Sequence, residues 1–287
     1  MPATTYLIQN GKTLRESNAA ISPSNRSFRY GDGCFETMKV SNGKLLLGNY
    51  HFDRLFSSLA LLQFDVPAHF TPAYLQAQVL ALATKNNHHP LARVRLTIYR
   101  GDGGLYDPQN HTPNYIIQTW SLNPSINNLN ENGLIIGVFE DAKKVCDRFS
   151  AIKSNNFLGY AMAALWVKRE QLNDAILLNP CNRVADATIA NVFIVKDGIA
   201  KTPSLDEGGI NGVMRRYLLE NLASIGVEAA EVPLTVADLM EADELFLTNS
   251  ISGIRWVKQL GSKNYQNKIA AYIHKKLIKE RLLLLTT

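Results

Sequence analysis

The chain has 287 residues, of which 46% are hydrophobic and 19% are charged. This length and composition suit one large globular domain or two of ordinary size, and they exclude a fibrous repeat or a disordered chain. The formal net charge of +5 comes from 30 basic and 25 acidic residues. Such a small excess does not indicate a nucleic-acid-binding protein, and we expect the basic run HKKLIKER near the C-terminus to form a solvated helix face.

The cysteines and the N-terminal segment indicate the compartment in which we expect the protein. Cys34, Cys146 and Cys181 are widely spaced, with no C-x-x-C pair and no histidine at metal-binding spacing. We therefore expect neither a disulfide framework nor a metal site. The first residues lack a basic segment followed by an apolar one, and no stretch approaches the ~20 apolar residues of a membrane span. These features predict a soluble, cytoplasmic protein that binds no membrane.

The first 120 residues predict an α+β domain. A strand at 5–11 ends in Asn-Gly, which is typical of a hairpin turn, and a second hairpin is expected in CFETMKVSNGKLLLG. Two helices follow at 50–64 and 72–87, where apolar residues recur at helical spacing. Strands then resume at 92–101 and 113–122.

Residues 121–130 are rich in Asn, Ser and Pro and predict a linker between two domains. The second domain, 131–287, is expected to mix strands with helices. The predicted strands are 133–140, 174–179, 191–195 and 243–249, and the predicted helices are 156–172, 211–226 and 262–285.

Lys153 is a candidate amine nucleophile. It precedes a predicted helix whose cap is Ser154, Asn155 or Asn156, so its ammonium would lie near a positive helix end and apolar neighbours. Both effects lower the pKa of a lysine and suit it to Schiff-base formation. The alternative is an ordinary exposed lysine.

Three further stretches carry polar groups suited to a phosphate. Gly208 and Gly209 lead into Ile210 and Asn211 at a helix start, where backbone N–H groups and the helix dipole attract anions. No Gly-Lys-Ser/Thr follows, so this is not a P-loop. Asn249 and Ser250 end a strand, and Arg54 lies on the first long helix. An ordinary glycine loop, a polar turn and a surface arginine are the alternatives.

The order of these features resembles the class IV aminotransferases, the fold type IV pyridoxal-phosphate (PLP) enzymes. They are an arginine in H-x-x-R-L, a lysine in K-S-x-N, an acid five residues before N-V-F, a glycine-rich helix start, and a strand ending in Thr-Asn-Ser. The resemblance covers nearly the whole chain. It implies a mixed α/β, two-domain fold like that of D-amino acid aminotransferase, in a homodimer.

The resemblance also implies roles for individual residues. Lys153 would form the Schiff base with PLP and shuttle the substrate's proton. Asp186 would pair with the pyridine nitrogen, where the family usually has Glu, whose side chain is one CH₂ longer. The phosphate would be bound by the Arg54 side chain, the backbone of Ile210 and Asn211, and Asn249 and Ser250.

Within the family, several positions resemble 4-amino-4-deoxychorismate lyase, which eliminates pyruvate to give 4-aminobenzoate for folate biosynthesis. They are Phe35 after Cys34, Thr37, whose hydroxyl would bond the departing group, and the stretch GGINGVMRR. Arg100 stands where a substrate carboxylate would be bound, with Phe35 as a further substrate contact.

Two alternatives stay open. One is a class IV aminotransferase that acts on branched-chain or D-amino acids with 2-oxoglutarate. The other is a protein that holds PLP, or binds nucleic acid through basic residues, without efficient turnover.

Overall fold

The computed structural model of the chain describes residues 5–104 and 110–284. Contacts divide the described residues into two compact units: those up to Pro124 with Ile152–Asn156, and Ser125–Ala151 with those from Phe157 onward. The main change of unit at Pro124 lies within the predicted linker. The segment Ile152–Asn156, however, groups with the first unit, whereas the sequence placed Lys153 in the C-terminal domain.

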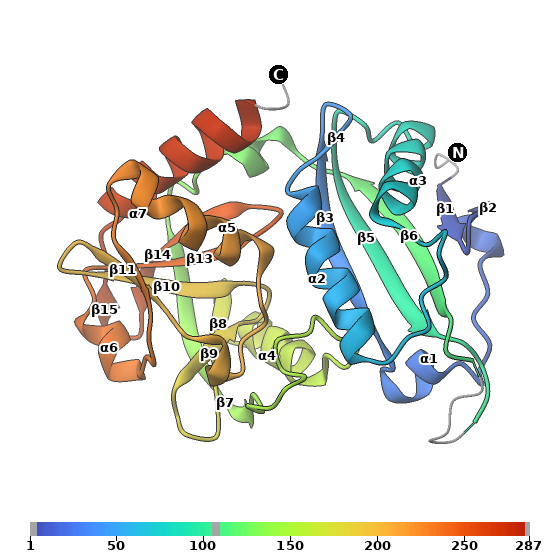
Figure 1. Cartoon of the computed structure of the whole chain (residues 1–287). Coiled ribbons are helices and arrows are strands. Elements are labelled where there is room, and N and C mark those ends of the chain that lie inside the picture. Colours follow the sequence, from blue (N-terminus) through green and yellow to red (C-terminus); the bar gives the residue numbers. More distant parts are fainter. Residues whose placement is uncertain (1–4, 105–109, 285–287) are drawn as a thin grey trace. The chain divides into compact units, whose positions relative to one another are not determined.

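The first unit is built on an antiparallel sheet of six strands (Figure 1). In order across the sheet they are β2 (Lys12–Arg15), β1 (Tyr6–Gln9), β6 (Pro113–Ser121), β5 (Leu91–Arg100), β3 (Gly33–Ser41) and β4 (Lys44–Leu45). Helices α2 (Gly48–Leu61) and α3 (Pro72–Lys85) cover one face. A short helix, α1 (Arg26–Tyr30), precedes β3.

Local sequence explains most of this unit. Asn10 and Gly11 have φ angles of 48° and 79°, as a two-residue hairpin turn between β1 and β2 requires. The core lies under α2 and α3, where Phe52, Leu55 and Leu59 of α2 pack on alternate residues of β3 such as Met38. The predicted hairpins, helices and strands of this domain are confirmed, each within a few residues.

The second unit contains a mixed sheet of nine strands. Their order is β12 (Ala229–Glu231), β11 (Ile199–Thr202), β10 (Asn191–Lys196), β13 (Glu244–Asn249), β14 (Gly253–Leu260), β7 (Leu134–Lys143), β8 (Asp174–Leu178) and β9 (Val184–Ala187), with β15 (Lys263–Asn264) paired to β14. Residues 188–190 join β9 directly to β10, although four strands separate the two in the sheet order. The sheet must therefore curl to bring β9 back towards β10.

Helices complete the second unit: α4 (Leu158–Arg169), α5 (Val213–Asn221), α6 (Val236–Glu241) and α7 (Lys268–Ile273), which continues as a π-helix over His274–Leu283. Short 3₁₀ turns span Glu16–Asn18, Pro124–Asn127, Leu205–Glu207 and Leu222–Ile225. The predicted terminal helix is thus too long at its start, because β15 occupies Lys263–Asn264. Strands β9, β11 and β12, which the sequence did not predict, are too short to show a period.

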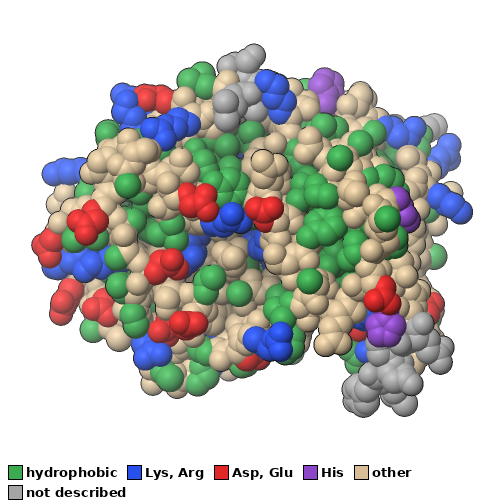
Figure 2. All heavy atoms as spheres, in the orientation of Figure 1, with side chains coloured by type: hydrophobic (Ala, Val, Ile, Leu, Met, Phe, Trp, Pro, Cys, Tyr) green, Lys and Arg blue, Asp and Glu red, His purple; other side chains and the backbone are tan. Residues whose placement is uncertain are grey.

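The basic run at the C-terminus forms a solvated face, as predicted. Leu277 and Ile278 are buried, while Lys276 pairs with Glu280 one turn later at 2.8 Å. On the face shown in Figure 2, the coloured basic side chains are interspersed with acidic ones. In the part of the chain that the structure describes, no helix has the length and apolar character needed to cross a bilayer.

Candidate functional site

Lys153 lies on a short extended segment that pairs with the start of β3. Phe35 N–H donates to the Lys153 carbonyl at 2.9 Å, and Cys34 pairs with Ser154 in an antiparallel bridge. The Lys153 ammonium lies 4.6 Å from the centroid of the Phe35 ring. Pairing with β3 explains why this segment groups with the first unit.

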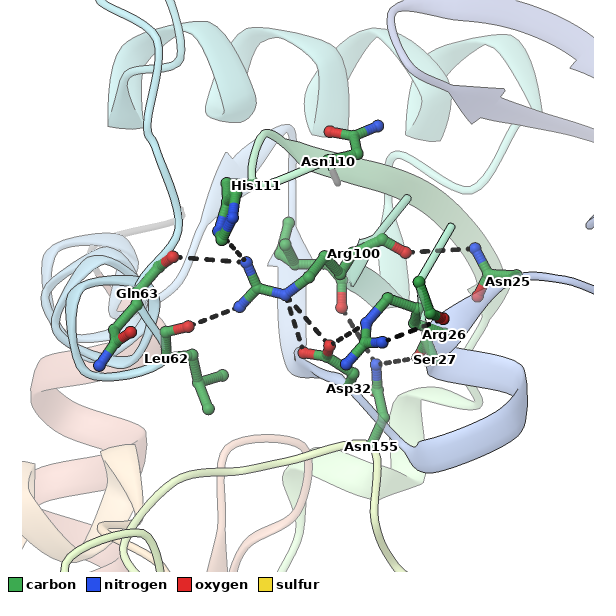
Figure 3. Close-up of polar contacts among 12 residues, drawn as sticks. Asn25, Arg26, Ser27, Asp32, Leu62, Gln63, Arg100, Asn110, His111 and Asn155 are labelled. Atoms are coloured by element: carbon green, nitrogen blue, oxygen red, sulfur yellow. Dashed lines mark hydrogen bonds and ion pairs between the residues drawn. The ribbon is translucent and has the colours of Figure 1, made fainter. Parts of the chain in front are cut away.

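The helix cap predicted next to Lys153 is wrong. Helix α4 begins at Leu158 after Phe157, and Asn155 serves another purpose (Figure 3). Its amide nitrogen donates to Ser27 Oγ at 2.9 Å and to the Ile98 carbonyl at 3.0 Å. Asn155 therefore anchors the lysine segment to the sheet and does not start the helix.

Arg54 is paired with a buried carboxylate that the sequence analysis did not single out. Its Nε donates to Glu36 Oε1 at 2.8 Å and its Nη2 to Glu36 Oε2 at 2.6 Å, and His51 Nδ1 lies 2.6 Å from the same Oε2. Arg54 is thus no surface residue, since its side chain is only 9% exposed. One signal was available in the sequence: Glu36 stands between Cys34 and Met38, on the strand face that carries core residues.

Electrostatics fix the protonation states of this trio. Burial alone would raise the pKa of Glu36, but the charges and hydrogen bonds of Arg54 and His51 outweigh it and lower the pKa to about 2. Burial lowers the pKa of His51, against the opposing effect of Glu36. At neutral pH we therefore expect a charged Glu36 that accepts Nδ1–H from a neutral His51.

A cation, a hydroxyl and an aromatic ring share the sheet face opposite α2 and α3. Thr37 pairs with Arg95 and Phe35 with Thr97 across β3 and β5. The Arg95 guanidinium carbon lies 3.7 Å from the Phe35 ring centroid, and Arg95 Nε donates to Thr97 Oγ1 at 3.1 Å. Burial lowers the pKa of Arg95, with Arg93 adding to the effect, so this cation is partly withdrawn from water. No role for Arg95 was predicted from the sequence.

The structure does not support the substrate-binding role predicted for Arg100 (Figure 3). This side chain is buried, with Nε donating to Asp32 at 3.1 Å and the two terminal nitrogens donating to the carbonyls of Leu62 and Gln63 at 2.5 and 3.3 Å. Its guanidinium carbon also lies 4.1 Å from the Phe64 ring centroid. Because its donors hold the loop at Asp32 and the loop at Leu62 and Gln63, the contacts of Arg100 favour a structural role.

In the second unit, Asp186 is buried within β9. It is only 2% exposed, so it does not lie at a solvated strand end. Its Oδ2 accepts from the hydroxyl of Tyr160 at 2.7 Å and from Ile210 N–H at 3.1 Å. A buried carboxylate is retained in proteins only when its charge is compensated, so its position indicates a specific role.

The glycine-rich segment before α5 packs tightly on the sheet. A Cβ at Gly209 would collide with the Ala185 carbonyl, and one at Gly212 with Asn191 Oδ1. Two N–H groups predicted to bind phosphate are used within the chain: that of Ile210 by Asp186, and that of Asn211 by the Ala151 carbonyl at 3.1 Å. Acceptors in the protein take both hydrogens in this arrangement, and the backbone role of the two residues stays a prediction.

The end of β13 offers polar groups next to this segment. Thr248 pairs with Asn191 of β10, whose side chain donates to the Ile210 carbonyl at 2.8 Å. The Thr248 hydroxyl is buried and has no hydrogen-bond partner among the described residues. Asn249 Oδ1 accepts from Ser252 N–H at 2.8 Å and closes the turn in which Ser250 lies. Thr248, the first of the three polar residues that end this strand, is thus a candidate in addition to Asn249 and Ser250.

Over residues 5–104 and 110–284, no three His, Cys, Asp or Glu side chains are grouped so as to hold a metal ion.

Residues 33–260 match the family described as Amino-transferase class IV. The "Putative branched-chain-amino-acid aminotransferase" of Methanocaldococcus jannaschii is 32% identical over 270 residues, which are 93% of this chain and 92% of that protein. Aminodeoxychorismate lyase of Vibrio harveyi is 33% identical over 246 residues, 85% of this chain and 88% of that protein. The two relatives have different activities at nearly the same identity.

A solved structure confirms the predicted fold. The branched-chain amino acid aminotransferase from Escherichia coli has a TM-score of 0.85 at 20% identity, over 98% of this chain and 95% of that chain. With the match over residues 33–260, the chain belongs to the class IV aminotransferases, the family of pyridoxal-phosphate-dependent aminotransferases and lyases that its sequence resembles.

Proposed function

We propose that this enzyme is a 4-amino-4-deoxychorismate lyase, which eliminates pyruvate from its substrate and releases 4-aminobenzoate. The observation that carries the proposal is the partly buried guanidinium of Arg95 against Phe35, with Thr37 opposite it in the sheet register. A desolvated arginine binds carboxylates strongly, and the lyase substrate carries two of them. The side chain of a branched-chain amino acid would instead require an apolar lining.

The residues present fit the family's cofactor, PLP. The Thr248 hydroxyl, buried without a partner in the described part of the chain, suits a phosphate oxygen. The carboxylate of Asp186, only 2% exposed, suits a protonated pyridine nitrogen, because burial favours a carboxylate that faces a positive charge. We therefore propose that Lys153 holds the cofactor, that Asp186 pairs with its ring nitrogen, and that its phosphate is bound by Arg54, Thr248, Asn249 and Ser250.

The reaction follows from these assignments. When bound, PLP supplies a ring that accepts the electron pair left when the carbon next to the substrate nitrogen loses its proton. Lys153 removes that proton. Thr37 donates a hydrogen bond to the departing oxygen, and Arg95 orients the substrate through a carboxylate.

An aminotransferase is the second candidate, favoured by the relative from Methanocaldococcus jannaschii. Arg95 is compatible with it, since 2-oxoglutarate also carries a second carboxylate. The two candidates differ in product. The lyase releases pyruvate and an aromatic amine, whereas the aminotransferase leaves glutamate and a keto acid.

The test uses the purified enzyme loaded with PLP. It is given aminodeoxychorismate in one assay and a branched-chain or D-amino acid with 2-oxoglutarate in another, with Lys153→Ala as the control. Pyruvate and 4-aminobenzoate from wild type alone would support the lyase. Glutamate would move the assignment to the aminotransferase. A bound cofactor with neither product would mean a PLP-holding protein without turnover.

We also propose a homodimer, on the basis of the family resemblance. Helix α4 supports it, because Leu158, Met162 and Leu165 recur at helical spacing and are 69, 42 and 61% exposed. Such an apolar stripe is typical of a surface covered by a partner. Light scattering would show twice the chain mass for the wild type, and a single-chain mass would refute the proposal.

A further inference from the structure

The carboxylate of Asp186 is fixed by two donors that converge on one oxygen. The hydroxyl of Tyr160 donates to Oδ2 at 2.7 Å and the N–H of Ile210 donates to the same atom at 3.1 Å. Both side-chain partners are buried, Asp186 at 2% and Tyr160 at 5% exposure. In a site withdrawn from water, these bonds decide the direction of the carboxylate.

Packing holds the Tyr160 hydroxyl in place. Its ring stacks on Phe157 with centroids 4.2 Å apart and planes inclined by 24°, and the Lys144 ammonium lies 4.6 Å from its centroid. Burial raises the pKa of Tyr160, and the negative charge of Asp186 raises it further. The phenol therefore keeps its proton and acts as the donor.

The second donor is equally constrained. Gly209 approaches the Ala185 carbonyl so closely that a Cβ would not fit, which brings the next peptide over β9. Asn191 Nδ2 then donates to the Ile210 carbonyl at 2.8 Å and fixes the orientation of that residue. Both donors to Asp186 are thus held in place by packing and hydrogen bonds within the second unit.

We propose that Tyr160 is a positioning residue, which orients the Asp186 carboxylate toward the ring nitrogen of the cofactor and stabilises its charge. The inference rests on the proposed function, in which Asp186 pairs with that nitrogen. Asp has one CH₂ fewer than the Glu usual in the family, so its carboxylate has a shorter reach and depends more on its surroundings for placement. A hydroxyl donor from α4 supplies this placement.

The test compares two cofactors in the apo protein. The dissociation constants of PLP and of 1-deazapyridoxal phosphate, which has a carbon in place of the ring nitrogen, are measured for wild type and Tyr160→Phe. Tyr160→Phe should weaken PLP binding about tenfold, the size expected for one hydrogen bond to a charged group. It should change the affinity of the deaza compound by less than about twofold, because no nitrogen is present for Asp186 to pair with.

A matched control is Tyr217→Phe, which removes a buried hydroxyl that donates to the Leu277 carbonyl at 3.2 Å in the same unit. It should leave the ratio of the two dissociation constants unchanged. An equal loss of affinity for both cofactors in Tyr160→Phe would overturn the proposal, since a merely structural role predicts that result.

Asp186→Asn separates the inference from the function beneath it. If this variant changes the ratio and Tyr160→Phe does not, the role of Tyr160 is refuted and the proposed role of Asp186 stands. If Asp186→Asn also leaves the ratio unchanged, Asp186 does not pair with the ring nitrogen and both proposals fall.

Discussion

Glu36 and Arg54 form a bidentate ion pair inside the first unit. Arg54 Nε lies 2.8 Å from Oε1 and Nη2 lies 2.6 Å from Oε2, and the two side chains are 2% and 9% exposed. The pairing fixes the plane of the guanidinium that we propose for phosphate binding. Glu36 thus stabilises the fold and also sets the geometry of Arg54.

Replacing Glu36 tests this pair. Glu36→Gln leaves a buried guanidinium without its counter-charge, so we expect the free energy of unfolding to fall by about 3 kcal/mol. We expect the dissociation constant of PLP to rise about tenfold, because Arg54 loses its orientation. Urea denaturation and cofactor titration measure the two effects.

The control is Glu170→Gln, which removes an exposed ion pair with Arg169 and should change stability by less than about 1 kcal/mol. Equal losses of unfolding free energy in Glu36→Gln and Glu170→Gln would refute the role proposed for the buried ion pair.

The same pair predicts a pH dependence. The pKa of Glu36 in the folded chain is about 2, below its ordinary value of 4.5. Its contribution is therefore fully present above about pH 4.5 and is lost as the pH falls towards 2. The stability difference between wild type and Glu36→Gln should shrink to about half or less by pH 3. Urea midpoints at pH 7, 5, 4 and 3 measure it, and a difference that stays constant down to pH 3 would contradict the assignment.

Sequence reasoning succeeded where short-range patterns decide the structure. The Asn-Gly turns and the apolar spacing of α2 and α3 depend on neighbouring residues, so their positions could be read from the chain. It failed for the helix cap after Lys153, because Asn155 bonds Ser27 and Ile98 from distant parts of the first unit. The residues next to Asn155 in the sequence do not show whether its side chain caps a helix or bonds a distant segment.

The site shows the same division. Lys153, Arg54 and Asp186 were selected through the order of motifs, but their partners were not. Glu36 and Tyr160 meet Arg54 and Asp186 only after the chain folds, at sequence separations of 18 and 26. Arg100 was predicted to bind a carboxylate because of its place in Tyr-Arg-Gly, which resembles the family's pattern, whereas Arg95 on the same strand was given no role. The two arginines are separated only by the folded structure. The register of β3 and β5 places Arg95 on the sheet face opposite α2 and α3, and the hydrogen bond to Asp32 ties Arg100 to a loop.

Arg95 and Arg100 should therefore respond oppositely to substitution. Arg95→Gln should raise the KM for the carboxylate substrate about tenfold or more with little change in stability, since it removes a charged hydrogen-bonding partner. Arg100→Gln should lower the free energy of unfolding by about 3 kcal/mol and change KM less than about twofold. Steady-state kinetics and urea denaturation separate the two. Arg93→Gln, an exposed neighbour on β5, is the control, and a KM effect confined to Arg100→Gln would restore the role first predicted for it.

Gly212 is expected to be intolerant of a side chain. A Cβ there would collide with Asn191 Oδ1, so Gly212→Ala should reduce the free energy of unfolding by about 1–3 kcal/mol and weaken PLP binding. Gly159→Ala is the matched control, because among the described residues its Cβ would meet only Ala142, at 3.9 Å. That change lies in α4 and should be neutral or stabilising by up to about 1 kcal/mol. Thermal unfolding of the two variants measures the difference. Equal melting temperatures would show that position 212 tolerates a side chain.

Thr248 supplies a test in which stability and binding move in opposite directions. Its buried hydroxyl has no partner in residues 5–104 and 110–284, so Thr248→Val should stabilise the apo protein by about 1 kcal/mol, because an unsatisfied polar group is removed. If that hydroxyl binds the phosphate, the same change should weaken PLP binding about tenfold.

Thr202→Val is the control, since its hydroxyl donates to the Val192 carbonyl at 2.7 Å. It should destabilise the apo protein by about 1 kcal/mol and leave PLP affinity unchanged. A Thr248→Val protein that is destabilised as much as Thr202→Val, with normal PLP binding, would show that the hydroxyl serves the fold and not the cofactor.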